Sequence, residues 1–140
     1  MHIISVHDNN DFADILDYIH DREFNLSDIV FDSQKSILII PTTVREYKTI
    51  RKGNSSLLFK KYIVPVFKAT LIIMNVVNYN IFDSEHIETY AFNILRFKDD
   101  ILTINAVPCL KISVEIQGLN IELRIDDERV LKEIQFYSIF

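Results

Sequence analysis

Histidines and carboxylates at the end of a helical pattern are the first side chains here that could carry acid–base or metal chemistry. Asp17 precedes His20 by three residues and Asp21 follows it, so a helix would place all three near one end. A helical metal site also needs a ligand from elsewhere, and the distant histidines are His2 and His86. An exposed polar helix face explains the pattern better, and we expect no metal.

Nucleophilic and cofactor chemistry have weaker support. Ser84 and His86 are close in the sequence, but the members of a catalytic triad usually come from separate elements, so a turn explains them. Cys109 is the only cysteine and lies in an apolar stretch, which predicts a buried structural thiol. Neither Gly53 nor Gly118 belongs to a phosphate-binding motif. We therefore expect no cofactor and no catalytic residue, while the question of enzymatic activity stays open and leans towards none.

Five asparagines interrupt strands that are otherwise apolar: Asn75, Asn78, Asn80, Asn93 and Asn105. Buried amides need hydrogen-bond partners, so a polar row across neighbouring strands could line a pocket. Solvent-facing positions on an open sheet explain the asparagines equally well. The pocket is the basis of the alternative function, a small-ligand binder or an enzyme with a site on the sheet.

Positive charge is concentrated in one segment, residues 45–68. It contains seven basic residues and one acidic residue, a net charge of +6, in a chain whose net charge is −5. Such a segment can bind an acidic partner or phosphate, or contact the acidic helix of the same domain. The partner-binding residues that we predict are Arg45, Lys48, Arg51, Lys52, Lys60 and Lys61.

Aromatic residues are interleaved with this basic segment. Tyr47, Phe59 and Tyr62 could stack on bases while the basic residues contact phosphates. The chain as a whole is acidic, however, and contains no recognised nucleic-acid motif. Weak nucleic-acid binding through residues 45–68 is therefore a third hypothesis, and we do not expect nucleic acid to be the main partner.

Helical patterns occur near both ends of the chain. Phe12, Ile15 and Ile19 recur at helical spacing and predict an amphipathic helix over residues 11–21. Val130 and Ile134, after a capping aspartate, predict a second helix at the C-terminus. No linker or repeat divides the chain, so residues 1–140 are expected to form a single globular domain.

Strand patterns fill the region between these two helices. Alternation and turn residues predict hairpins over residues 29–40, 87–107 and 112–125, together with a long central strand from residue 67 towards residue 81. The expected fold is α+β, a mainly antiparallel sheet of about six to eight strands with an N-terminal and a C-terminal helix. The N-terminus has no signal-peptide pattern and the apolar runs are short, so we expect a cytoplasmic protein without membrane contact.

Three strand-like runs carry a resemblance to a known group of proteins: residues 26–31 (LSDIVF), 71–79 (LIIMNVVNY) and 112–119 (ISVEIQGL). Their succession, over residues 26–125, resembles the strand order of small uncharacterised bacterial proteins, some of which are grouped as immunity proteins of polymorphic toxin systems. The resemblance implies a non-enzymatic domain that binds and blocks a partner protein. An acidic surface would suit a basic toxin, whereas the basic segment fits that picture poorly.

The leading hypothesis is accordingly a non-enzymatic protein-binding or regulatory module with an unidentified protein partner. It rests on the absence of a catalytic constellation in the sequence and on a β domain with aromatic and charged loops. A homodimer is compatible with this hypothesis, because edge strands and apolar helices invite self-pairing.

Overall fold

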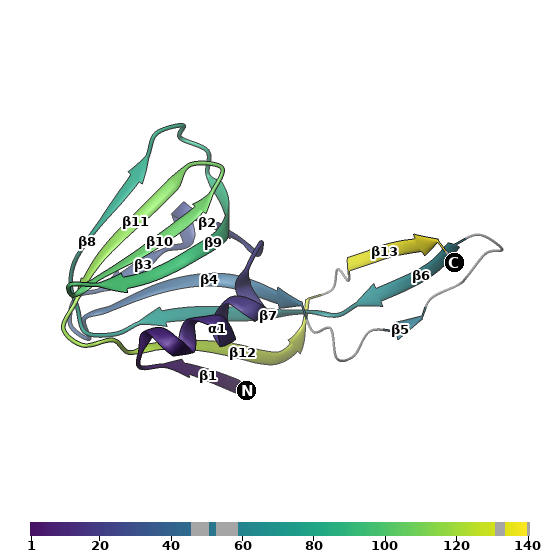
Figure 1. The fold of residues 1–140 in the computed structure, drawn as a ribbon, viewed down its shortest axis with the longest axis horizontal. Helices are drawn as coiled ribbons and strands as arrows, with labels where there is room; N and C mark the ends of the chain where they lie inside the picture. The colour runs from purple at the N-terminus through teal and green to yellow at the C-terminus, as the bar shows by residue number, and fades with distance from the viewer. Residues whose placement is uncertain (46–50, 53–58, 131–133, 140) are drawn as a thin grey trace.

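The described part of the chain contains two antiparallel sheets of five strands each and a third sheet of three strands (Figure 1). The computed structural model describes residues 1–45, 51–52, 59–130 and 134–139. The first sheet has the spatial order β1 (His2–Val6), β12 (Ile121–Arg129), β7 (Val66–Ile73), β4 (Ile37–Arg45) and β3 (Val30–Asp32). The second has the order β2 (Glu23–Asn25), β9 (Thr89–Lys98), β10 (Ile101–Val107), β11 (Leu110–Ile116) and β8 (Val76–Asp83). The third has the order β13 (Ile134–Ile139), β6 (Phe59–Val64) and β5 (Arg51–Lys52).

Each of the two larger sheets buries one face, as the alternation of apolar residues along its strands requires. In the second sheet, Leu102 and Ile104 of β10 and Ile112 of β11 are fully buried. In the first sheet, Leu71 of β7 and Leu123 of β12 are fully buried as well. All five belong to one hydrophobic cluster that includes strands of both sheets. The fold is therefore a β-rich α+β fold whose core includes residues from both sheets.

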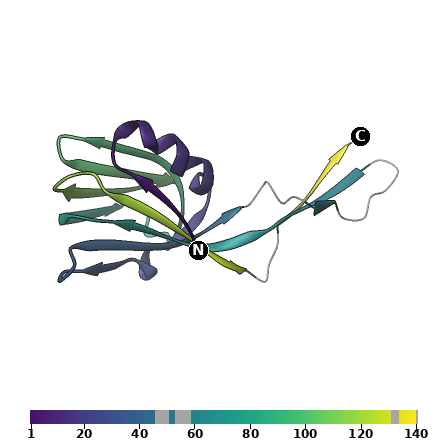
Figure 2. The same cartoon turned by 90° about the horizontal axis from the view of Figure 1, so that it is seen from below.

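One short helix, α1 (Phe12–Ile19), packs beside the sheets (Figure 2). Its buried residues are Phe12, Ile15 and Ile19, and the helix contacts β1 and β4 of the first sheet and β9 of the second. The helix predicted over residues 11–21 is thus confirmed. It is entered through a 3-10 turn (Asn9–Asp11), where the Asp8 carboxylate accepts a hydrogen bond of 2.8 Å from the Asn10 amide. A second 3-10 turn (Leu26–Asp28) follows β2.

The prediction of a C-terminal helix is wrong: the described residues in this region form strands. Strand β12 continues as far as Arg129, and Ile134–Ile139 forms β13, which pairs with β6. The run from residue 134 to 139 contains two isoleucines and two aromatic residues, which favour strands when a partner is present. Hydrogen bonding to the distant strand β6 therefore decides the secondary structure here, although the local spacing of apolar residues is helical. The two main sheets also contain ten strands, more than the six to eight expected.

Two of the three predicted hairpins are confirmed. Strands β3 and β4 pair around a turn in which Ser36 has a positive φ of 55°. Strands β9 and β10 pair around Asp99 and Asp100, whose φ values are 52° and 61°, as a tight type I′ hairpin turn requires. Pro41 lies within β4, beyond the short segment that pairs with β3, so it occupies a local edge position.

The predicted long strand and the predicted third hairpin are instead two chain segments that pair with each other and bend together as one antiparallel ribbon. Strands β7 and β12 are neighbours in the first sheet, and their continuations β8 and β11 are neighbours in the second sheet. The bends occur at Asn75, with φ 58°, and at Gly118, with φ 93°. The Asn75 side-chain amide donates to the Gly118 carbonyl at 3.3 Å, and the Gln117 amide donates to the Asn75 carbonyl at 2.9 Å. The two bends therefore lie against each other.

The three-stranded sheet extends away from the two larger sheets (Figures 1 and 2). We call β5, β6 and β13 the arm, and the two five-stranded sheets with α1 the body. The chain passes between them at Pro65, which separates β6 from β7, and the Val130 amide donates to the Val66 carbonyl at 2.7 Å. In the part of the chain that the structure describes, no helix is long and apolar enough to cross a membrane.

Replacing Gly118 with Ala tests the bend between the two sheets. The added methyl group would have room, since its nearest neighbour would be the Asn75 side-chain nitrogen at 3.9 Å, but a φ of 93° is strained for any residue with a Cβ. We expect Gly118→Ala to lower the free energy of unfolding by about 1–2 kcal/mol in urea denaturation followed by circular dichroism. Gln117→Ala, at the exposed neighbouring position, is the control and should change it by less than about 0.5 kcal/mol. Equal stability of the two variants would contradict a strained bend.

Candidate functional site

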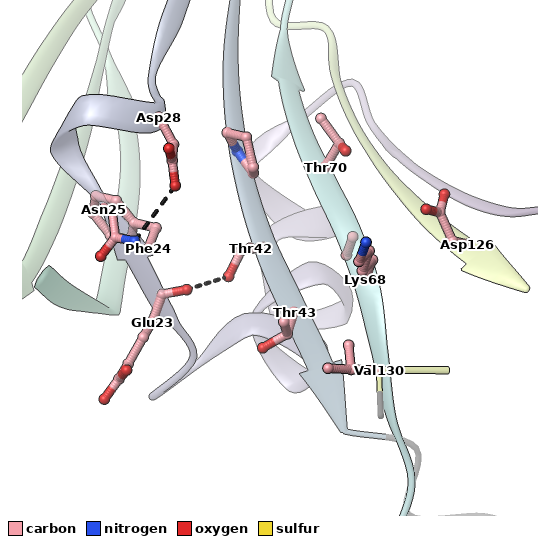
Figure 3. A pocket seen from close by; sticks show the side chains of 12 residues that line it. Glu23, Phe24, Asn25, Asp28, Thr42, Thr43, Lys68, Thr70, Asp126 and Val130 are labelled. Carbon is pink, nitrogen blue, oxygen red and sulfur yellow. Dashed lines mark hydrogen bonds between the residues drawn. The ribbon is translucent and has the colours of Figure 1, made fainter. Parts of the chain in front are cut away.

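An open groove of about 450 Å³ crosses β4 and β7 of the first sheet, between β2 on one side and β12 on the other (Figure 3). Its polar lining combines carboxylates, threonine hydroxyls, one asparagine and one lysine: Glu23, Asn25, Asp28, Thr42, Thr43, Lys68, Thr70 and Asp126. Phe24 and Ala69 contribute apolar surface. The groove therefore offers mixed charge and hydroxyl groups, but no imidazole and no thiol.

Two threonines of β4 hold one wall of this groove in place. Thr42 is only 8% exposed, and its hydroxyl donates to the Glu23 carbonyl of β2 at 2.8 Å. The next hydroxyl, that of Thr43, accepts hydrogen bonds from the Arg22 guanidinium at 2.5 and 3.2 Å. These contacts join an edge strand of the second sheet to an inner strand of the first. The hydroxyl groups are therefore used in structural hydrogen bonds, and no histidine is present in the lining to activate them.

A second depression, of about 430 Å³, lies at the C-terminal end of α1. Asp17, His20, Asp21 and Arg45 contribute to its lining, which confirms that the two carboxylates and the imidazole share one end of the helix. His20 Nδ1 lies 3.2 Å from an Asp21 carboxylate oxygen, and His20 Nε2 lies 3.2 Å from the Asn93 side-chain oxygen.

The contacts of His20 resemble the orienting half of a catalytic triad without its nucleophile. An aspartate fixes the imidazole, but the other ring nitrogen faces an asparagine, and the lining of this depression contains no serine, threonine or cysteine. Among the residues that the structure describes, no group of three histidine, cysteine, aspartate or glutamate residues could hold a metal ion. The His20 imidazole therefore lies between the Asp21 carboxylate and the Asn93 amide.

Two titratable groups with shifted pKa values, Tyr90 and Glu88, form hydrogen bonds in and beside the segment that connects β8 to β9. The buried Tyr90 phenol donates to the Asp83 carboxylate and accepts from the Ile87 amide at 3.1 Å, and burial raises the pKa of Tyr90 to about 12. Hydrogen bonds from Ser27, whose amide lies at 2.7 Å, lower the pKa of the Glu88 carboxyl. Each shift therefore accompanies a contact that holds chain segments together.

The structure divides the six predicted partner-binding residues between two places. Arg45 lies in the body, half-buried beside the acidic end of α1. Arg51 and Lys52 form β5, and Lys60 and Lys61 lie in β6, so these four belong to the arm. The sixth, Lys48, lies outside the described residues.

The strand asparagines are distributed over the bend and three strands of the second sheet. Asn78 and Asn80 are exposed on β8, Asn75 lies at the bend, and Asn93 and Asn105 are half-buried on β9 and β10. The groove and the depression described above are lined by none of the five. Cys109, expected to be buried, is half-buried.

The groove was not among the sites expected from the sequence. A usable signal was present, because the polar pair Thr42 and Thr43 directly follows an apolar strand and Pro41. The other lining residues, including Lys68 and Asp126, come from elements far apart in the sequence, so no local pattern could group them.

Comparisons with known proteins add no relative. No family model, curated protein or solved structure matches the chain. The candidate sites are therefore argued from their own geometry.

Thr42→Val tests whether the hydroxyl of Thr42 holds β2 against β4. The variant leaves the Glu23 carbonyl without its donor in a part-buried contact, so we expect a loss of about 1–2 kcal/mol in the free energy of unfolding. The same exchange at half-buried Thr70, which has no side-chain hydrogen bond among the described residues, is the control and should be nearly neutral. A Thr42→Val variant as stable as the control would show that the contact is dispensable.

A spectrophotometric pH titration tests the environment of Tyr90. Exposed tyrosines ionise near pH 10, whereas the Tyr90 phenol should stay protonated until about pH 12. Since the pKa is raised in the folded state, its contribution to stability is fully present below pH 10 and is lost as the pH rises through 12. Absorbance at alkaline pH should show that Tyr90→Phe removes the component that titrates last. Loss of a component near pH 10 would contradict this assignment.

Proposed function

We propose that this chain is a non-enzymatic protein-binding module that uses its arm to bind an acidic surface of a partner protein. The partner-binding residues are Arg51, Lys52, Lys60 and Lys61 of the arm, with Lys48 as a further contributor. Arg45, which lies beside the acidic end of α1, belongs to the body instead.

The observation that carries this proposal is the separation of charge between arm and body. The three arm strands contain four basic residues and no acidic residue. Residues 1–44, which belong to the body, contain eight acidic and two basic residues, a net charge of −6. A projecting element with charge of one sign attracts a partner of the opposite sign and accelerates their association. β13 adds Phe136 and Tyr137, residue types that are enriched at protein interfaces.

The contacts in the body support binding over catalysis. The hydroxyl groups of Thr42 and Thr43 take part in structural hydrogen bonds, and the His20–Asp21 pair faces an amide instead of a nucleophile. A catalytic site of the acyl-transfer type would need a nucleophile within reach of a base. The groove and the depression are thus better suited to contact a partner than to transform a substrate.

Inhibition of a toxin in the cytoplasm is one concrete form of this function, and it follows from the resemblance to immunity proteins. An acidic face of such a toxin would meet the arm, and a basic face would meet the body. Charge complementarity of this kind affects specificity and association rate more than affinity.

Charge reversal in the arm tests the proposal. The tagged full chain is used to capture partners from its native cells, once with and once without nuclease, and the captured proteins are quantified by mass spectrometry. Changing Arg51, Lys52, Lys60 and Lys61 to Glu should lower the yield of a stoichiometric partner by about tenfold or more, and added salt should weaken capture by the wild type.

A matched control keeps the change in net charge the same. It changes Lys35, Arg96, Lys98 and Lys111 to Glu, four exposed residues of the body. This variant should retain the partner. Equal loss with both variants would refute a role for the arm, and a signal that disappears with nuclease would instead indicate nucleic-acid binding.

A further inference from the structure

The outer edge of β8 is the longest open strand edge of the second sheet. β8 is the last strand of that sheet and pairs with β11 on one side, while among the described residues no strand pairs with its other side. The opposite edge strand, β2, has only three residues, compared with eight in β8. β8 lies at the end of the body away from the arm (Figure 1).

Apart from a bulge at Val77, this edge lacks the features by which proteins normally prevent edge-to-edge pairing. β8 contains no lysine, no arginine and no proline, and its only charge is Asp83 at its last position. Three apolar side chains are also exposed along it, with exposed fractions of 49% for Val77, 38% for Ile81 and 55% for Phe82. A long open edge with a single charge and three exposed apolar side chains is a site for pairing with another strand. A bulge at Val77 interrupts the pairing with β11, and regular register extends from Asn78 to Asp83.

The sequence of β8 identifies a second copy of the same chain as the occupant. The five residues from Val77 to Ile81 (VNYNI) read almost the same in both directions about Tyr79. An antiparallel copy centred on Tyr79 places Asn78 opposite Asn80 and Val77 opposite Ile81. A symmetric dimer requires this self-complementarity, because each residue contacts the equivalent surface of the other copy.

Charge and packing agree with this register. Asp83 would lie opposite Asn75, so no like charges face each other across the dimer. The Tyr79 ring packs against Phe31 with ring centroids 5.3 Å apart, which supports the middle of the strand from the first sheet. The exposed Ile81 side chain would gain an aliphatic neighbour in Val77 of the second copy.

We propose that this protein forms a symmetric homodimer in which β8 of two copies pair antiparallel about Tyr79. The second sheet of one copy and the second sheet of the other then form one continuous sheet across the dimer axis. Because β8 lies at the end of the body away from the arm, both arms remain free, and the dimer holds whether or not the arm binds a partner.

Sedimentation velocity of the full chain over a wide concentration range tests the dimer. The wild type should change from monomer to dimer as concentration rises. Two double variants then test the register, both at exposed positions. Both variants remove the hydrogen bond that the Asn78 side chain accepts from the Tyr79 amide at 2.9 Å, so its loss is common to them and cancels in the comparison. Asn78→Lys with Asn80→Lys places like charges opposite each other twice across the axis and should weaken the dimer about tenfold or more. Asn78→Lys with Asn80→Glu places opposite charges there and should retain or strengthen it.

Circular dichroism of both variants confirms that each is folded before association is compared. A wild type that stays monomeric at every concentration overturns the proposal. So does a dimer that both variants form as tightly as the wild type, because such a dimer uses another surface. A weakened dimer with the first variant and a retained dimer with the second supports the antiparallel register about Tyr79.

Discussion

The hydrogen-bonded contact between the bends at Asn75 and Gly118 is the constraint on which the rest of the structure depends. Two chain segments leave the first sheet and enter the second at the same level, joined by Asn75 to Gly118 and Gln117 to Asn75 contacts of 3.3 and 2.9 Å. The pair β7–β12 and the pair β8–β11 are consequently one antiparallel ribbon folded across both sheets. A slip of register in one sheet would therefore disturb the other, and alternate residues would lose their place in the core.

The features with functional potential follow from how this ribbon orients the remaining strands. It brings β2, an edge strand of the second sheet, against β4 of the first, where the Thr42 hydroxyl donates to the Glu23 carbonyl. The groove lies beside this contact, and α1 packs against strands of both sheets. Its C-terminal end brings His20 to Asn93 of β9. Structural hydrogen bonds thus occupy the hydroxyl groups of Thr42 and Thr43 and the imidazole of His20.

Two surfaces at opposite ends of the molecule differ in physical character. The arm has positive charge and no carboxylate, whereas the exposed edge of β8 is nearly uncharged and apolar. Charged surfaces mainly guide association, and open strand edges supply backbone hydrogen bonds and apolar contact. The proposed acidic partner and the proposed second copy would therefore bind at opposite ends, without competition between them.

Local pattern was sufficient for α1, for the β3–β4 and β9–β10 hairpins and for the concentration of positive charge, because each depends on residues close in the sequence. It could not separate β7 from β8, since apolar residues continue through the bend and only the φ of 58° at Asn75 changes the sheet. The same limit applies to β13, whose pairing with β6 joins residues about 75 positions apart in the sequence. It also applies to Arg45, which the tertiary structure places beside Asp21 and not in the arm.

The sequence by itself determined which segments alternate between apolar and polar residues and where charge accumulates. Only the tertiary structure decided which strands share a sheet and which residues line a groove, because these depend on long-range pairing that no short window contains.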